Sequence, residues 1–136
     1  MDDIAHLQFP NLVLPFQLDT ESAVALALIP HLPIFSTAHQ LGGEIYFRAN
    51  GVDIPYDGTE TRDFQKGDVT YWRSPTGEML FSIAVFYDRT PFGDGPAPTA
   101  SSPCVRIGRL MADPATLHLL KPITTGEPVR FGLETL

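Results

Sequence analysis

Residues 43–48, Gly-Glu-Ile-Tyr-Phe-Arg, decide the fold of this chain, because apolar and polar side chains alternate along them. Ile45 and Phe47 share one parity, whereas the glutamate, the tyrosine and the arginine share the other. Successive side chains of a β-strand point to opposite faces of the sheet, so the pattern predicts a strand with one apolar and one polar face. We expect the apolar face to lie in the core.

Other short segments, bounded by glycine, proline and Asn-Gly or Asp-Gly turns, also have the composition of strands. Residues 67–72, Gly-Asp-Val-Thr-Tyr-Trp, begin with a tight turn and continue as a strand. Residues 78–87 contain the longest β-like run, which predicts a central strand covered on both faces over part of its course. Further strands are predicted at 12–18, 34–38, 105–111 and 128–133.

Two short helices are predicted between the strands. Residues 22–29 are rich in alanine and leucine and follow Asp19, a candidate N-cap. Because almost every position of this segment is apolar, we expect the helix to be well buried, covering one mouth of a barrel. Asp113 and Pro114 are a typical N-cap and first-turn pair for a second helix over residues 115–121.

About seven strands and two short helices, separated by turns, favour a mostly β fold, a closed antiparallel β-barrel. A parallel sheet is disfavoured because only one helix falls between the early strands. The 136 residues are the size of one ordinary domain. A chain of this length buries roughly two-thirds of its unfolded surface. We therefore expect a single domain over residues 1–136 that folds without a disulfide or a metal.

The charge balance argues against several partners. The net charge is −7, only two lysines are present, and the seven arginines are scattered. Nucleic acids and anionic membranes both need clustered cations, so neither is an expected partner. Cys104 is the only cysteine, which allows no intrachain disulfide and favours a reducing compartment, the cytoplasm. We expect Cys104 to be a small buried residue rather than a reactive thiol.

The sequence contains no strong catalytic or cofactor signature. It lacks the Gly-x-Ser-x-Gly turn of hydrolases, the P-loop and the glycine pattern of dinucleotide-binding folds. The four histidines, His6, His31, His39 and His118, are not spaced like metal ligands. We expect neither a metal nor a cofactor.

The polar face of residues 44–48 is the first candidate site. A tyrosine between two opposite charges is a common composition of binding surfaces, because the ring supplies area and the hydroxyl a polar contact. His39 lies upstream of a Gly-Gly break, and a histidine folded back against Glu44 would form an acid–base unit. The alternative is that these polar side chains are only solvated.

Tyr71 and Trp72 form the second candidate pair, because adjacent strand residues cannot both face the core. In one interpretation Tyr71 packs inward and Trp72 caps the end of the barrel. In the other, one of the two rings lies in a surface groove.

Two further segments carry candidate ligand contacts. Tyr87 precedes residues 88–103, a 16-residue stretch rich in Pro, Gly, Ser and Thr. Loops of this length are often functional, and this one would form a lid if it folded over the aromatic face. Arg106 and Arg109 are three residues apart, so we expect them to face opposite sides, with one available to bind an anion.

Five blocks in order resemble the small, stand-alone cyclophilin-like proteins of unknown function. The blocks are 43–47 (Gly-Glu-Ile-Tyr-Phe), 67–72 (Gly-Asp-Val-Thr-Tyr-Trp), 86–91 (Phe-Tyr-Asp-Arg-Thr-Pro), 105–108 (Val-Arg-Ile-Gly) and 126–131 (Gly-Glu-Pro-Val-Arg-Phe). The resemblance covers residues 12–131. It implies a cyclophilin-type barrel and a groove lined by Glu44, Tyr46, Tyr71, Trp72 and the loop after Tyr87.

True cyclophilins are peptidyl-prolyl isomerases. Their sites contain an arginine in a Phe-His-Arg context and a Phe-x-x-Gln-Gly-Gly-Asp stretch, and this sequence has neither. Residues 47–51, Phe-Arg-Ala-Asn-Gly, resemble the first motif only weakly. The resemblance therefore implies the barrel without implying the isomerase activity.

Three functional hypotheses remain open. The first is a small-molecule-binding protein, or an enzyme of unidentified reaction, with Glu44 and His39 as candidate catalytic residues. The residues expected to contact its ligand are Glu44, Tyr46, Tyr71, Trp72, Tyr87 and Arg106. The second is a prolyl isomerase or proline-peptide binder, which a proline-peptide isomerisation assay distinguishes. The third is a structural module that forms a homodimer, which light scattering distinguishes.

Overall fold

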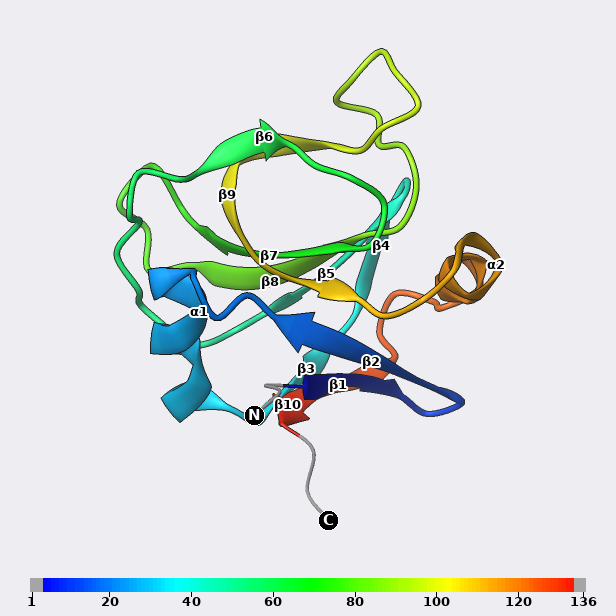
Figure 1. The fold of residues 1–136 in the computed structure, drawn as a ribbon, viewed down its shortest axis with the longest axis horizontal. Helices are drawn as coiled ribbons and strands as arrows, with labels where there is room; N and C mark the ends of the chain where they lie inside the picture. Colours follow the sequence, from blue (N-terminus) through cyan, green and yellow to red (C-terminus); the bar gives the residue numbers. More distant parts are fainter. Residues whose placement is uncertain (1–3, 134–136) are drawn as a thin grey trace.

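Ten antiparallel strands form one strongly curved sheet in the computed structural model, which describes residues 4–133 (Figure 1). In chain order the strands are β1 (Ile4–Phe9), β2 (Leu12–Leu18), β3 (Ile34–Thr37), β4 (His39–Leu41), β5 (Glu44–Arg48), β6 (Thr61–Asp63), β7 (Asp68–Arg73), β8 (Phe81–Phe86), β9 (Thr99–Leu110) and β10 (Pro128–Leu133). The expected mostly β, antiparallel fold is confirmed.

Hydrogen bonds join the strands in the order β3-β10-β1-β2-β9-β7-β8-β5-β4, with β6 attached to β9. The two ends of this order, β3 and β4, are consecutive in the chain and are separated only by Ala38. The chain changes partner at this residue, from β10 to β5. Because no ladder joins β3 to β4 among residues 4–133, the hydrogen-bonded path is open, and the expected closed barrel is not observed as a closed ring of ladders.

The inner face of the curved sheet holds the main core, and the alternation in β5 is as expected. Ile45 and Phe47 are fully buried on this face, whereas the polar residues of β5 face outward. Aromatic rings fill the centre of the core. The Phe16 and Phe131 rings stack with centroids 4.6 Å apart, and Phe47 contacts Phe131 at 5.7 Å.

A second, smaller cluster covers the outer face of the central strands. The first half of β9 curls back with β6 over β7 and β8 (Figure 1). It buries Phe64, Ala84, Phe86, Ala100 and Cys104, with the rings of Phe64 and Phe86 stacked at 5.1 Å. All six residues of β8 are therefore buried, which confirms the expectation of a central strand covered on both faces.

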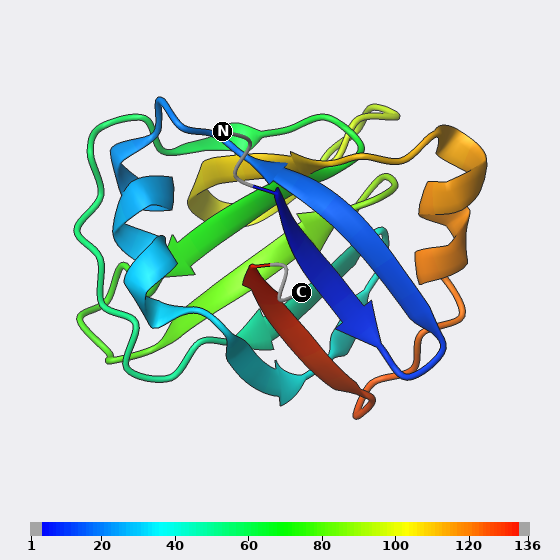
Figure 2. The ribbon, with the colours of Figure 1, turned by 60° about the horizontal axis from the view of Figure 1, so that its bottom comes forward.

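Two short helices lie at opposite ends of the sheet, α1 (Ala23–Leu28) and α2 (Pro114–Leu117), each followed by a single 3₁₀ turn (Figure 2). The N-cap of α1 is Ser22, whose hydroxyl accepts a hydrogen bond from the Ala25 amide. The expected cap, Asp19, instead accepts a hydrogen bond from the amide of Glu21. Only one face of α1 is buried, because Leu26 is 48% exposed.

The second helix begins as expected. The Asp113 carboxylate accepts a hydrogen bond from the Thr116 amide, and Pro114 is the first helical residue. The helix continues as the 3₁₀ turn His118–Leu120. No helix among residues 4–133 is long and apolar enough to cross a membrane.

The expected loop over residues 88–103 is shorter than predicted, because its last five residues belong to β9. Thr99 pairs with Asp63 of β6, and Cys104 pairs with Thr61. Three strands, β1, β4 and β6, are not among those predicted from the sequence, and β4 and β6 have only three residues each.

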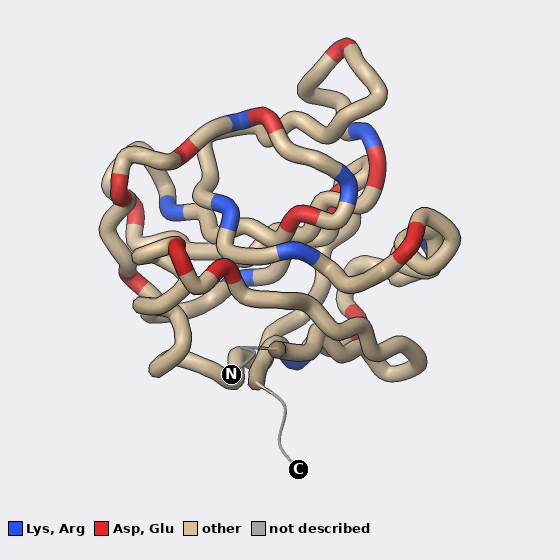
Figure 3. The backbone as a smooth tube through the Cα atoms, in the orientation of Figure 1, with Lys and Arg blue, Asp and Glu red and all other residues tan. Residues whose placement is uncertain are grey.

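The lysine and arginine residues are spread over several elements and lie among acidic residues (Figure 3).

Tyr71 lies in the core and is fully buried, so its hydroxyl needs internal partners. The hydroxyl donates a hydrogen bond to the carbonyl oxygen of Val52 and accepts one from the amide of Ile54, at 3.0 Å. Tyr71 therefore ties the segment after β5 to the core, and it does not line the surface pocket described below.

Tyr71→Phe is expected to lower the free energy of unfolding by about 2 kcal/mol, because two buried backbone groups lose their only side-chain partner. Urea denaturation measures the loss. Tyr46→Phe is the matched control, since the Tyr46 hydroxyl has no hydrogen bond among the described residues, and it is expected to change stability by less than about 0.5 kcal/mol. Equal stabilities of the two variants would contradict this role of Tyr71.

Candidate functional site

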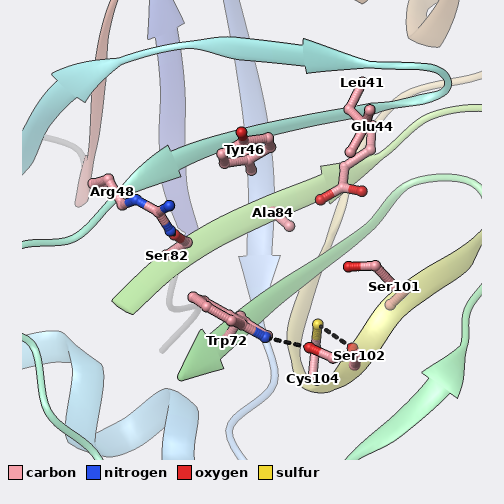
Figure 4. Close-up of a pocket in the computed structure, with 11 residues that line it drawn as sticks. Leu41, Glu44, Tyr46, Arg48, Trp72, Ser82, Ala84, Ser101, Ser102 and Cys104 are labelled. Carbon is pink, nitrogen blue, oxygen red and sulfur yellow. Dashed lines mark hydrogen bonds between the residues drawn. The ribbon is translucent and has the colours of Figure 1, made fainter. Parts of the chain in front are cut away.

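A pocket with a cavity volume of about 190 Å³ lies on the outer face of the central strands, beneath the first half of β9 (Figure 4). Its lining residues come from four strands and the end of β4. They are Leu41, Glu44, Tyr46, Arg48, Trp72, Ser82, Ala84, Ala100, Ser101, Ser102 and Cys104. Three of the residues expected to contact a ligand, Glu44, Tyr46 and Trp72, are thus brought together.

The register of β5, β8 and β7 places these side chains on one face. Residues directly opposite each other on paired strands share a face of the sheet. Tyr46 lies opposite Ala84, and Arg48 lies opposite Ser82, which in turn lies opposite Trp72. Trp72 is therefore a groove residue rather than a cap of the barrel end.

Arg48 lies between the two aromatic rings of the pocket. Its Cζ atom is 5.8 Å from the centroid of Tyr46 and 5.7 Å from that of Trp72, which are cation–π distances. Its Nη1 donates a hydrogen bond of 2.7 Å to the hydroxyl of Ser82. The indole Nε1 of Trp72 donates to the hydroxyl of Ser102 on β9, which fixes the ring at the pocket wall.

Glu44 supplies the carboxyl group of the pocket. The residue is only 9% exposed, and its carboxyl group points into the cavity (Figure 4). No hydrogen bond or ion pair joins this carboxyl group to any residue within 4–133. Burial raises the pKa of Glu44 from 4.5 to about 7. Near neutral pH the group can therefore both accept and donate a proton.

A tight turn before β5 positions Glu44. Gly42 has a φ of +60°, and a Cβ atom on Gly43 would lie 2.3 Å from the backbone of Asp88, so neither position suits a larger residue. The hydroxyl of Tyr87 lies 3.0 Å from the carbonyl oxygen of Gly42. Tyr87 therefore holds the turn and does not line the pocket.

His39 does not pair with Glu44. The register of β4 with β5 places His39 opposite Tyr46 and places Leu41 opposite Glu44. The imidazole stacks on the ring of Tyr46 with centroids 4.9 Å apart. The expected His–carboxylate unit is therefore not formed, because β4 pairs with β5 across the Gly-Gly turn in a register that separates the two groups.

Arg106 also lies outside the pocket. A β-bulge in β9 places both Arg106 and Arg109 against Asp68, with the nearest nitrogens at 3.1 and 3.0 Å from its Oδ1. The expectation that the two arginines face opposite sides is wrong, because the bulge adds one residue between them. Arg106 also forms an ion pair with Asp19 at 3.4 Å.

Sequence reasoning missed the wall formed by β9. Ser101 and Ser102 lie in the stretch predicted as a loop, yet the alternation of small residues at Ala100, Ser102 and Cys104 is a strand signal that would have found it. Cys104 is buried, as expected. Burial, and then the nearby Glu44 carboxylate, raise the pKa of its thiol to about 12.

Among residues 4–133, no group of three or more His, Cys, Asp and Glu side chains is arranged to hold a metal ion. The side chains that line the pocket supply one carboxyl group, one guanidinium, four hydroxyls, one thiol and two aromatic rings.

Comparison with known proteins agrees with the fold. The sequence profile of the family described as Cyclophilin-like matches residues 4–132. The chain belongs to the Cyclophilin-like family. It is also similar to the solution structure of the hypothetical protein AF2241 from Archaeoglobus fulgidus, with a TM-score of 0.75 and 27% identity over 98% of this chain and 95% of that one. No curated protein sequence matches the chain.

Glu44→Gln is expected to stabilise the protein above pH 7 and to have little effect near pH 4. The folded chain holds the Glu44 proton more tightly than the unfolded chain, so the stability of the wild type falls as the pH rises from 4.5 to about 7. A pKa shift of this size corresponds to a loss of roughly 3 kcal/mol in the free energy of unfolding of the wild type. Urea denaturation at several pH values measures the difference between the variant and the wild type.

The exposed Glu60 supplies the control for this experiment, and Glu60→Gln is expected to leave the pH dependence unchanged. If the stability difference between Glu44→Gln and the wild type stayed constant from pH 4 to pH 8, the carboxyl group would not be desolvated as described.

The Cys104 thiol is expected to react with a disulfide reagent at pH 8 at least about a hundredfold more slowly in the folded protein than in urea. A thiol with a pKa near 12 is almost entirely protonated at this pH, and the thiolate is the nucleophile. Absorbance of the released reagent anion follows the reaction. Comparable rates in the folded and unfolded protein would show that the thiol is more accessible than its 3% exposure implies.

Proposed function

We propose that this protein binds a small organic molecule in the pocket, with Glu44 as the main polar contact. The observation that carries the proposal is the Glu44 carboxyl group, which belongs to a residue only 9% exposed, points into the cavity and makes no hydrogen bond or ion pair within residues 4–133. Its oxygens open onto the cavity rather than being sealed inside the protein, and a largely desolvated titratable group that faces a cavity is typical of a binding site.

The walls of the pocket support the same proposal. The rings of Tyr46 and Trp72 and the methyl groups of Ala84 and Ala100 supply apolar walls, and hydrogen bonds to Ser82 and Ser102 hold Arg48 and Trp72 in place. This is the usual composition of a small-molecule site. The two aromatic side chains contribute large, rigid contact areas at low cost in conformational entropy.

The size of the pocket restricts the ligand. Sites for drug-sized molecules have volumes of about 300–1,000 Å³, whereas this cavity has about 190 Å³. The ligand is therefore a small metabolite rather than a nucleotide or a peptide.

A bound ligand would offset part of the free-energy cost of desolvating Glu44. Keeping the ionised Glu44 carboxylate away from water costs roughly 3 kcal/mol, as its raised pKa indicates. A ligand that donates a hydrogen bond to this group recovers part of the cost, since hydrogen bonds to charged groups contribute about 1.5–3 kcal/mol. The pKa near 7 also suits proton transfer, which is the chemistry an enzyme using this site would draw on.

A metabolite screen that reads both melting temperature and Trp72 fluorescence tests the proposal. Trp72 is the only tryptophan in the chain and lies in the pocket wall, so its emission reports on this site alone. At least one compound is expected to raise the melting temperature and change the emission together. Glu44→Ala is expected to weaken its binding at least tenfold, which corresponds to about 1.4 kcal/mol.

Glu60→Ala removes a carboxylate outside the pocket and is expected to leave binding unchanged. Trp72→Ala is expected to abolish the thermal shift. If every stabilising compound protected the wild type and Glu44→Ala equally, the pocket would not be the binding site.

A further inference from the structure

Two opposite charges face the same pocket from the same strand without meeting. Glu44 begins β5 and Arg48 ends it, and both line the cavity. Four steps along the extended chain separate their Cα atoms by about 14 Å, at ~3.4 Å per residue. In Figure 4 the ring of Tyr46 lies between the two side chains.

Arg48 has no carboxylate partner among the described residues, a feature it shares with Arg62, Arg89 and Arg130, but of these four only Arg48 lines the pocket. Arg73 is paired with Asp53, and both Arg106 and Arg109 are paired with Asp68. The guanidinium of Arg48 instead contacts one neutral hydroxyl, that of Ser82, and the faces of two rings. A guanidinium carries five N–H donors and pairs best with a carboxylate or a phosphate, so most of its donors remain available to an anion.

The Glu44 end is equally open. The shift in the Glu44 pKa comes from burial alone, with no contribution from a neighbouring cation, so Arg48 is too distant to neutralise it. The neighbouring side chains at this end are Leu41, Ala84, Ser101 and Cys104, none of which supplies a positive charge (Figure 4). This end therefore favours a ligand group that donates a hydrogen bond.

Between the two charged ends the pocket is apolar. Tyr46 and Ala84 are opposite each other in the β5–β8 ladder, and Trp72 forms the wall on the β7 side. A hydrocarbon chain or an edge of a planar ring fits this strip without leaving a polar group unpaired.

We propose that the pocket selects a small, elongated, two-ended molecule: an anionic group, carboxylate or phosphate, lies at Arg48, an apolar segment crosses Tyr46, and an amine, amide or hydroxyl donates to Glu44. This inference rests on the proposed binding function and specifies its ligand class. A ligand with only an anionic end would leave the Glu44 carboxyl group unpaired, and a ligand with only a donor end would leave the guanidinium without an anion.

Binding of 4-(aminomethyl)benzoate, with benzoate and benzylamine as its one-ended counterparts, tests the inference. Isothermal titration and Trp72 emission at pH 7.5 measure the three affinities. The two-ended probe is expected to bind at least tenfold more tightly than either counterpart, because it satisfies both charges in one pocket. Using 6-aminohexanoate, hexanoate and hexylamine repeats the comparison with a flexible segment, and 4-(aminomethyl)phenyl phosphate replaces the carboxylate end by a phosphate.

Matched variants assign each end of the probe. Arg48→Gln is expected to reduce 4-(aminomethyl)benzoate to the affinity of benzylamine while leaving benzylamine unchanged. Glu44→Gln is expected to reduce it towards the affinity of benzoate. Arg48→Lys keeps the charge and is expected to retain most of the preference, which separates loss of the cation from loss of packing. Arg89→Gln, at an exposed arginine outside the pocket, is the control and is expected to change nothing.

The outcomes separate this inference from the function on which it rests. If benzoate or benzylamine bound in the pocket as tightly as the two-ended probes, the inference would be overturned and the binding function would stand. The same conclusion would follow if compounds from the metabolite screen bound and none of the two-ended probes did. If no compound from the screen and no probe changed Trp72 emission, both proposals would fail together.

Discussion

The register of the β5–β8–β7 ladder is the constraint on which the rest of the structure depends. Its inner face supplies Ile45, Phe47 and Tyr71 to the main core, and its outer face supplies the floor of the pocket. Because side chains alternate along a strand, a slip of one residue would exchange these two sets, placing Glu44 in the core and Phe47 in the pocket. The packing that stabilises the fold therefore also fixes the geometry of the site.

The outer face becomes a site only because β9 returns across it. On a sheet face open to solvent, water would hydrate Glu44 and Arg48, and neither charge would have a desolvation cost. The first half of β9, supported by β6, removes water from this face and leaves a cavity between Trp72 and Cys104. The raised pKa of Glu44 reflects that desolvation, whose free-energy cost the ligand proposed above would offset in part.

Membership of the Cyclophilin-like family establishes the architecture but leaves the chemistry to the residues themselves. Several of the residues expected to contact a ligand have supporting rather than binding roles. Tyr87 holds the turn before β5, Tyr71 ties a loop to the core, and Arg106 balances the buried Asp68. The proposed binding function therefore depends on Glu44 and Arg48, which face the cavity without a charged partner within residues 4–133.

The sequence by itself determined the strand class of the central segments and the faces of β5, because period-two alternation is a local property of the chain. That Glu44, Tyr46 and Trp72 line one groove was implied by the family resemblance, and the register of β5, β8 and β7 brings them together. The sequence did not determine that β9 begins at Thr99, that a bulge brings Arg106 beside Arg109, or that His39 stacks on Tyr46. Each of these depends on which distant strand pairs with which, and at what register. Only the tertiary structure decided those pairings, since they are set by the packing of whole faces rather than by any short stretch of residues.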